Sequence, residues 1–451
     1  MRQKIRQQLS FVEPYIDHPH ADELAMMSAL IDICPIIATL IHADLIRDLD
    51  DPETGREGLL TAEQVFRAIV IKQMNGYSYQ ELAYHLADSK CYRAFCRIGY
   101  GDKNPSDSTL QRDIKKVRPE TLEEINKRLN MVAKEKGIEN GRMIRTDCTV
   151  VESNIHHPTD SSLLEDCVRV LSRLTSRAKE DFGLDSHFSD HNRRAKKRAL
   201  QILNAKSKKK RIKPYKDLLN VTEKTVGYAT AAAMSLDIIS AIGIWGAAEV
   251  VEALRHFISL AEQVISQTKR RVLMNEIVPA AEKVVSIFEP HTDIIVKDRR
   301  ETYYGHKVAI SAGASGLITD LVIEDGNPAD ATLALEMVAR QKRIYGRVPR
   351  QVAYDGGFAS KKNLSEIKGM GVKDVSFSKK CGLKIADMAK STWVYKKLRD
   401  FRAGIEGIIS FLKRSFGMRR CTWRGLSSFK AYAWSSVVTA NLLMMARHLI
   451  S

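Results

Sequence analysis

"MIRTDCTVVESNI", residues 143–155, marks the point at which the sequence changes from a helical to an extended pattern. β-Branched residues dominate this stretch and polar residues partly alternate with them, which predicts a central β-strand. Asp147 lies inside the predicted strand, where an acid is unusual. The stretch therefore predicts a sheet built around this strand, with Asp147 as the first candidate functional residue.

Helical and extended patterns alternate on the C-terminal side of this strand. Residues 159–290 have helical patterns, which predicts a helical insertion between the first and second strands. The segments that follow are strands at 293–298, 303–311 and 316–326, a helix at 329–342, a strand at 350–355, a helix at 360–368, a strand at 372–378 and a long helix around residue 406. Three strands joined antiparallel, followed by a crossover to a parallel strand, form a mixed sheet. The predicted fold class is therefore α/β, a mixed sheet flanked by helices.

The region between residues 59 and 130 has the pattern of several helices. An apolar helical period breaks at Gly76 and resumes after Ser78, which can form a capping box with Glu81. This predicts a helix, a tight turn and a second helix. A further helix is predicted after Ser106, and its exposed polar residues are Gln111, Arg112, Lys115 and Lys116. The arrangement suits a DNA-binding helix-turn-helix, and a helical hairpin with a basic face fits it equally well.

Composition and charge favour a nucleic-acid partner. The chain of 451 residues has 71 Lys and Arg against 54 Asp and Glu, a net charge of +17. Such an excess usually indicates a polyanionic partner. The seven cysteines are scattered and form no C-x-x-C pair, which predicts reduced thiols in a cytosolic protein. The N-terminus is too polar for a signal peptide, and the weakly charged run at 226–248 predicts a buried helix, so no membrane partner is expected.

Two short basic runs lie within the predicted helical insertion. They are "RRAKKRA" at 193–199 and "KSKKKRIK" at 206–213. Such runs are usually solvated helix faces. Because these cations are clustered on an already basic protein, phosphate binding is favoured over that alternative.

Three acids could converge in the predicted sheet. If the strand that ends at Asp355 pairs beside the first strand, Asp355 lies next to Asp147, and the long helix could bring in Glu406. Three carboxylates in one pocket repel each other unless cations are bound, and hard carboxylate oxygens favour Mg²⁺ or Mn²⁺. Two such ions form the clamp used in phosphodiester displacement. These residues therefore predict a two-metal nuclease or transferase site.

The long helix carries a stripe of charge around Glu406. At about 100° per residue, four side chains fall within roughly 60° of arc; they are Arg399, Arg402, Glu406 and Lys413. One interpretation is a solvated face with an Arg402–Glu406 pair, and the other is that Glu406 holds a metal while the flanking cations contact phosphates. Gly404 and Gly407 lower helix propensity, which would make sense if a backbone or nucleic acid approaches closely there.

These residues resemble the bacterial insertion-sequence transposases of the cut-and-paste DDE type, which have a ribonuclease-H-like catalytic domain. That family has a Tyr-x2-Arg-x3-Glu-x6-Lys signature, and Arg402, Glu406 and Lys413 match its spacing while Arg399 stands at the tyrosine position. The resemblance also covers "TDCTVVESNIHHPTDSSLL" around residue 147, "YGHKV" at 304–308, "GNPAD" at 326–330 and "AYDGGFAS" at 353–360. The helical region at 59–130 looks like the N-terminal domain common in this group.

The resemblance implies a domain organisation and a set of site residues. The implied domains are a helical DNA-binding domain at 1–135, a ribonuclease-H-like catalytic domain at 140–158 and 291–451, and a helical basic insertion at 159–290. The implied catalytic and metal-binding residues are Asp147, Asp355 and Glu406, with two Mg²⁺ ions or Mn²⁺ as cofactor. The expected DNA-binding residues are Arg399, Arg402, Lys413, Arg112, Lys115 and Lys116.

The resemblance also implies a reaction and its partners. The reaction is metal-dependent cleavage at the ends of the element, followed by transfer of the freed 3′-hydroxyls into target DNA. The implied partners are terminal inverted repeats, target DNA and a second copy of the chain in a synaptic complex, in the bacterial cytoplasm at the nucleoid. Two alternatives remain at this point: a transposase-derived DNA-binding protein without cleavage, and a ribonuclease-H-like nuclease that does not transpose.

Other polar residues near these motifs are expected to have supporting roles. For Lys307 a DNA contact is plausible, whereas a structural role is favoured for His306. The acids of "EDGNPAD", residues 324–330, suit a turn and a helix cap. Glu152 lies an odd number of residues from Asp147 and is expected on the opposite face of the strand.

Overall fold

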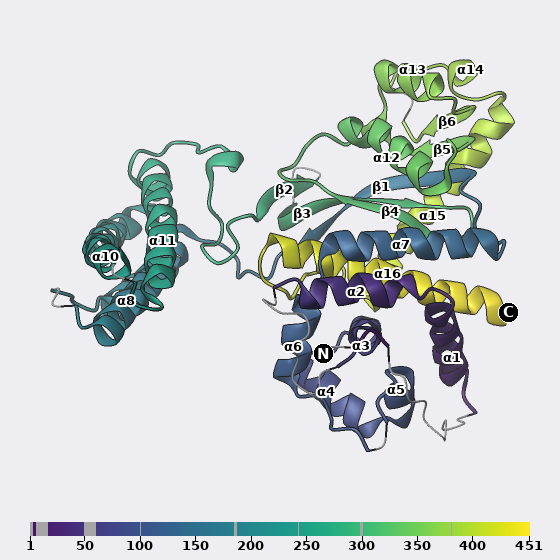
Figure 1. The fold of residues 1–451 in the computed structure, drawn as a ribbon. Helices are drawn as coiled ribbons and strands as arrows, with labels where there is room; N and C mark the ends of the chain where they lie inside the picture. Colours follow the sequence, from purple (N-terminus) through teal and green to yellow (C-terminus); the bar gives the residue numbers. More distant parts are fainter. Residues whose placement is uncertain are drawn as a thin grey trace. The chain divides into compact units, whose positions relative to one another are not determined.

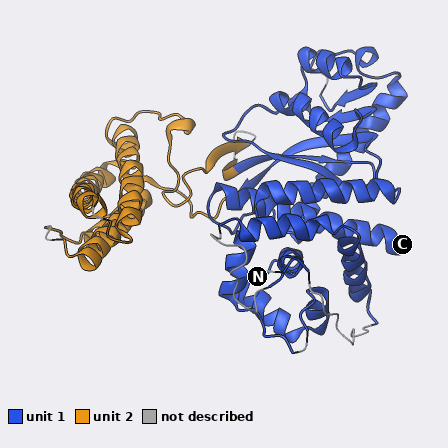
Figure 2. Cartoon of the chain, viewed as in Figure 1, with its two compact units in different colours: residues 1–152, 306–451 blue, residues 153–305 orange. Residues whose placement is uncertain are grey.

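The computed structural model describes residues 3–5, 17–48, 60–99, 101–184, 187–241, 243–297, 301–379 and 381–451. Parts of the predicted N-terminal domain, at residues 1–2, 6–16, 49–59 and 100, lie outside the described residues. The chain forms two compact units, coloured separately in Figure 2. Unit 1 comprises residues 1–152 and 306–451, and unit 2 comprises residues 153–305.

A mixed sheet forms the centre of unit 1, which confirms the predicted α/β class. Its strands are β1 (Met143–Glu152), β3 (Glu301–Ala312, which begins in unit 2), β4 (Ile318–Ile323), β5 (Gln351–Tyr354) and β6 (Asp374–Phe377). β1 lies between β3 and β5. β3 and β4 pair antiparallel, whereas β1 with β5 and β5 with β6 pair parallel. The strand predicted around Asp147 is therefore central to the sheet.

Helices cover both faces of this sheet. On one face, α12 (Asp330–Tyr345) and α13 (Lys361–Gly369) share a hydrophobic core with Ile144 of β1 and Val352 of β5. The second face packs against α7 (Pro119–Glu135), α15 (Thr392–Ser415) and α16 (Leu426–Ile450), together with the N-terminal helices. The short α14 (Ile385–Met388) precedes α15. Figure 1 shows α12 and α13 on one side of the sheet and α7 and α16 on the other.

The N-terminal helices of unit 1 include the predicted helices on either side of Gly76 and the predicted helix after Ser106. They are α1 (Pro19–Asp32), α2 (Ile36–Ile46), α3 (Ala62–Asn75), α4 (Tyr79–Asp88), α5 (Lys90–Phe95) and α6 (Asp107–Lys115). Gly76 ends α3 in the left-handed conformation, and Ser78 and Glu81 form the predicted capping box at the start of α4. α16 packs against α1, α3 and α7, so these helices and the sheet bury a common core.

Arg67 of α3 is a fully buried cation in this core. Its guanidinium donates to Glu63 Oε1 at 3.0 Å, to Asp32 Oδ1 at 2.6 Å and to the Phe95 carbonyl at 2.9 Å. Burial is the largest effect on the pKa of Arg67 and lowers it, as does a nearby arginine. The two carboxylates act to raise the pKa but do not outweigh these effects. The group is thus paired on several sides within α3, α1 and α5, which fixes how these helices pack.

Replacing Arg67 by Met should destabilise unit 1 by about 1–3 kcal/mol, because the buried Glu63 carboxylate loses one of its two arginine partners and keeps only Arg97. Urea unfolding followed by circular dichroism measures the change. The matched control is Arg128→Met, since Arg128 pairs with Glu124 at the surface and should contribute less than about 1 kcal/mol. Equal losses in the two variants would contradict this account of the core.

Unit 2 is a helical assembly with its own hydrophobic core. Its helices are α8 (Asp160–Phe182), α9 (Asn192–Asn204), α10 (Lys208–Ala241) and α11 (Ala247–Thr268), followed by short segments at Lys269–Leu273 and Ala280–Glu282. β2 (Asp293–Lys297) pairs antiparallel with residues 301–305 of β3. Most of the residues at 159–290 for which the sequence predicts helices are thus helical in the structure.

The prediction of one buried helix over residues 226–248 is wrong. α10 ends at Ala241 and α11 begins at Ala247, and Trp245 between them is 96% exposed. Gly243 and Gly246 have positive φ angles of 79° and 84°, which favour a turn over a continuing helix. Within the described residues, no single helix has the length and apolar character of a membrane span; α1 and α2 meet that criterion only as a pair bent by 78°.

Candidate active site

Asp147 and Asp355 are neighbours across two parallel strands. β1 pairs with β5 so that Thr146 lies opposite Tyr354. Asp147 directly follows Thr146, and Asp355 directly follows Tyr354. Side chains alternate along a strand, and odd-numbered positions of β1 such as Val151 face the core shared with α15. The prediction that the strand ending at Asp355 lies beside the first strand is therefore confirmed.

Arg145 attaches α15 to β1 close to these acids. Its Nη1 donates to the Phe401 carbonyl at 2.9 Å, and its guanidinium carbon lies 4.7 Å from the centre of the Phe401 ring. A Cβ atom at Gly404 would lie 2.0 Å from Arg145 Nη1, so Gly404 leaves room for this side chain. The predicted close approach is present at Gly404, but the approaching group is Arg145. At Gly407 no described atom lies within 4 Å of a Cβ, so the approach of a backbone is wrong there and the approach of nucleic acid stays a prediction.

Gly404→Ala should reduce stability by about 1 kcal/mol, whereas Gly407→Ala should increase it by about 0.5–1 kcal/mol. Both changes raise helix propensity, but only the methyl group at position 404 displaces Arg145 and its charged hydrogen bond. Thermal unfolding of the two single variants measures the difference. An increase in stability for both variants would show that Arg145 can move without loss.

Arg402 of α15 joins all three predicted acids. Its Nη2 lies 2.9 Å from Asp147 Oδ2 and 2.9 Å from Asp355 Oδ1, and its Nη1 lies 2.9 Å from Glu406 Oε1. The Arg402 side chain is 17% exposed and Asp147 is 15% exposed, while Asp355 at 37% and Glu406 at 66% are more open. The predicted Arg402–Glu406 pair is thus present, but it belongs to a four-residue cluster that lies beside the middle of β1 and the C-terminal end of β5.

The backbone after β5 holds Asp355 in place. Asp355 precedes the short 3₁₀ turn Gly356–Phe358, and its Oδ1 accepts a hydrogen bond from Ser378 Oγ at 2.6 Å. Burial acts to raise the pKa of Asp355, but the hydrogen bonds from Ser378 and Gly356, with Arg402 and Lys379 nearby, outweigh it and lower the pKa. Asp355 is therefore held as an ionised carboxylate at neutral pH.

The two glycines that follow Asp355 are explained by close neighbours. A Cβ atom at Gly356 would lie 2.8 Å from the Lys379 side chain, and one at Gly357 would lie 2.7 Å from Asp330 Oδ2. A side chain at position 356 would push Lys379 away from the turn, and one at position 357 would push Asp330 away. The "DGG" sequence is therefore required by packing beside the carboxylate.

The "YGHKV" and "GNPAD" motifs contact each other through Lys307. Lys307 Nζ donates to the Pro328 carbonyl at 2.6 Å and to Asp330 Oδ1 at 2.9 Å, and its side chain is only 15% exposed. The Lys307 ammonium therefore hydrogen-bonds within the chain, whereas the sequence made a DNA contact plausible for it. His306 is buried and packs edge-on against Phe429, in accordance with the structural role expected for it. The "YGHKV" motif lies on β3, the neighbour of the strand that carries Asp147.

The other predicted DNA-binding residues lie on two separate elements. Arg399 is exposed and Lys413 is half-buried, both on α15 with Arg402. On α6 and at its C-cap, Arg112 and Lys115 are exposed and Lys116 is half-buried. α6 packs against α3 and α4. The residues on α15 therefore lie on the element that carries Glu406, and those on α6 form a second basic surface.

The three carboxylates suit a hard divalent cation. In the described part of the chain, no three His, Cys, Asp or Glu side chains form a ready metal cluster, since the Arg402 guanidinium lies between the acids. The acids nevertheless converge on one positively charged group, and carboxylate oxygens are the ligands that Mg²⁺ and Mn²⁺ prefer. Asp147, Asp355 and Glu406 therefore fit the requirements of such an ion. Arg145 and Ser378, which hold this arrangement, were missed in the sequence, although Arg145 shares the strand face of Asp147.

Comparison with known families matches two parts of the chain. Residues 291–442 match the model described as "Transposase DDE domain", and residues 12–116 match "Transposase domain (DUF772)". The first match contains Asp355 and Glu406, and the second contains α1 to α6. Asp147 lies between the two matched regions. No curated protein and no solved structure matched the chain.

Proposed function

Because this chain belongs to the insertion-sequence DDE transposases, we propose that it cleaves DNA at the ends of its element and transfers the freed 3′-hydroxyls into target DNA. The observation that carries the proposal is the convergence of Asp147, Asp355 and Glu406 on the single guanidinium of Arg402. The pairing of β1 with β5 and the antiparallel β3–β4 hairpin support a ribonuclease-H-like catalytic domain. In this proposal the three acids are the catalytic residues.

Each side chain of the cluster has a distinct part in this proposal. Asp147, Asp355 and Glu406 would hold two Mg²⁺ or Mn²⁺ ions, which when bound activate the attacking oxygen and stabilise the leaving oxygen. Ser378 orients Asp355 through its hydrogen bond. Arg402 balances the carboxylates, and with Arg399 and Lys413 it presents positive charge for the phosphates beside the cut.

The proposed partners follow from the same family and from the basic surfaces. Terminal inverted repeats would bind α6 through Arg112, Lys115 and Lys116, and target DNA would enter at the acidic cluster. A second copy of the chain is proposed in the synaptic complex, and the bacterial cytoplasm is the proposed location. Three intact acids favour an active enzyme over a DNA-binding derivative without cleavage.

A plasmid that carries the DNA flanking this reading frame tests the proposal. We expect nicks at the inverted repeats with Mg²⁺ and none after EDTA, because the carboxylates need the ion to activate water. Restoring Mg²⁺ should restore cleavage at the same positions. Binding without cleavage would favour the inactive DNA-binding protein, and cleavage unrelated to the repeats would favour a nuclease that does not transpose. Primer extension across the plasmid locates the cuts.

A further inference from the structure

The positive charge of unit 2 is concentrated in one segment. Residues 193–216 contain twelve Lys and Arg and no Asp or Glu. The rest of residues 153–305 contains 13 Lys and Arg against 19 Asp and Glu, so it is net acidic. This segment alone accounts for the basic character of unit 2. Such local concentration differs from an evenly solvated surface, in which charges of both signs are mixed.

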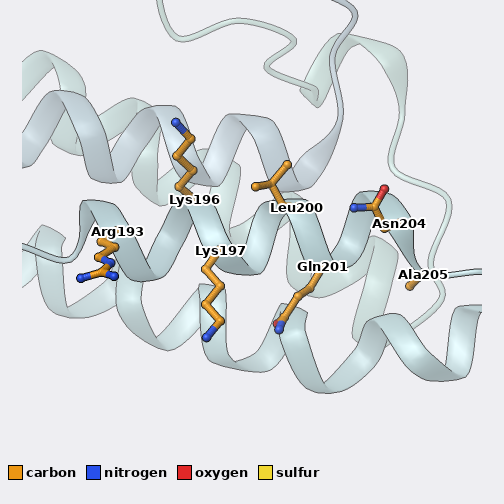
Figure 3. A pocket seen from close by; sticks show the side chains of 7 residues that line it. All are labelled: Arg193, Lys196, Lys197, Leu200, Gln201, Asn204 and Ala205. Carbon is orange, nitrogen blue, oxygen red and sulfur yellow. The ribbon is translucent and has the colours of Figure 1, made fainter.

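The segment forms two packed helices whose cations face outward. It covers α9 and the first turns of α10, which pack against each other. Ala195, Ala199 and Ile202 of α9 are buried, as is Tyr215 of α10. Figure 3 shows Arg193, Lys196 and Lys197 extending from α9 around a shallow pocket lined also by Leu200, Gln201, Asn204 and Ala205. We call this the α9–α10 surface: the exposed side chains of residues 193–216.

Only part of this charge is used within unit 2. Arg194 and Arg198 both pair with Asp217, and hydrogen bonding from Arg194 lowers the pKa of that carboxyl despite its partial burial. These two arginines tie α9 to α10. Within the described residues, no acid pairs with the remaining cations, and all of them are exposed. Arg211 also donates a hydrogen bond to a backbone carbonyl. The remaining cations are Arg193, Lys196, Lys197, Lys206, Lys208, Lys209, Lys210, Arg211, Lys213 and Lys216.

We propose that the α9–α10 surface binds the phosphate backbone of double-stranded DNA without reading its sequence. Eight of the twelve cations are lysines, which act on phosphates as mobile point charges and do not recognise base edges bidentately as arginine does. Single-strand binders combine a basic groove with exposed aromatic side chains on which the bases stack, and the one aromatic residue of the segment, Tyr215, is buried. The choice of DNA over another polyanion rests on the proposed function.

The α9–α10 surface adds a contact that the catalytic cluster and α6 do not provide. A duplex held at these lysines is bound at any sequence, so it serves flanking or target DNA, which has no fixed sequence. Leu200 and Leu203 are exposed on the same helix, and basic helices with exposed leucines also bind anionic lipid. Vesicles are therefore the competing ligand in the test.

The test variant is Arg193→Gln/Lys196→Gln/Lys197→Gln in the full chain. The matched control is Arg177→Gln/Arg255→Gln/Lys269→Gln, which removes the same charge from unit 2 at exposed cations that pair with acids. Fluorescence anisotropy in EDTA, with a random-sequence duplex that lacks the inverted repeats, gives Kd over a range of salt concentrations. Circular dichroism checks that both variants fold.

We expect the test variant to lose at least about tenfold in affinity at low salt. Its slope of log Kd against log salt should fall by about 2–3, since each lost phosphate contact contributes about 0.9. The matched control should stay close to wild type. A wild-type slope in the test variant, an equal loss in the control, or loss of binding to anionic vesicles with duplex binding intact would overturn the proposal.

The proposed function is tested separately. Asp147→Asn should bind the random duplex as wild type does. If the wild-type chain fails to cut at the repeats while the test variant still loses duplex binding, the cleavage proposal fails and the α9–α10 surface stands.

Discussion

Asp147→Asn is expected to lose Mg²⁺-dependent cleavage by at least about 10³-fold, because a metal-held oxygen is worth several kcal/mol of transition-state stabilisation. Asparagine keeps the size of the side chain and one oxygen, but it removes the negative charge that faces Arg402 Nη2 at 2.9 Å. Asp355→Asn should behave in the same way. Nicking of the end-containing plasmid under single-turnover conditions measures the loss, and DNA binding should be retained.

Glu152→Gln is the matched control for this prediction. Glu152 is the last residue of the same strand, and its backbone pairs with Arg420 outside the acidic cluster. The Glu152→Gln variant should cleave DNA at the wild-type rate. Full cleavage by Asp147→Asn would remove Asp147 from the catalytic set, and loss of DNA binding in that variant would indicate that the pocket had collapsed.

Arg402→Gln is expected to destabilise the metal-free protein by about 1–3 kcal/mol at neutral pH, the range for losing hydrogen bonds to charged groups. Glutamine leaves three neighbouring carboxylates without the cation that they share. The same loss should make Mg²⁺ more stabilising in the variant than in wild type, because no guanidinium has to be displaced from between the acids. Urea unfolding in EDTA and in Mg²⁺ measures both effects.

The pH dependence of this variant has a definite sign. The pKa of Asp355 is lowered in the folded chain, so its ionised form stabilises the fold above the unfolded pKa, and this contribution is lost as pH falls through the lowered value. The difference between wild type and Arg402→Gln should therefore be largest near neutral pH and shrink in acid. Arg399→Gln is the control, since Arg399 makes no ion pair within the described residues. Equal stability of both variants in EDTA would contradict the role of Arg402.

Much of the fold could be predicted because its signals are local. The capping box at Ser78 and Glu81, the N-cap Ser106 and the β-branched run around Asp147 each act within a few residues of chain. α1 and α2 are expected only as unspecified parts of the helical domain at 1–135, although Pro19 at the start of α1 is a local helix signal. The error at 226–248 came from treating a weakly charged run as one helix and giving no weight to Gly243 and Gly246, which lie in the turn between α10 and α11.

The contacts that complete the site could not be predicted, because they join residues distant in sequence. The acids were identified in order, but Arg402 had been assigned to phosphate or to Glu406 alone, and its contacts with Asp147 and Asp355 depend on how α15 crosses β1. The pairing of Lys307 with Asp330 likewise follows from the approach of β3 to the start of α12. Spacing along one helix or strand determines which residues share a face, but not which face they meet.

The position of α16 in the chain constrains the order in which unit 1 can assemble during translation. α1, α3 and α7 pack against α16, which begins at Leu426, so these helices cannot complete their core until that part of the chain has left the ribosome. Unit 2, with its own core, can fold earlier. A nascent chain therefore has no finished core in unit 1, and a polypeptide truncated before residue 426 should expose apolar helix faces and become a substrate for chaperones and proteases.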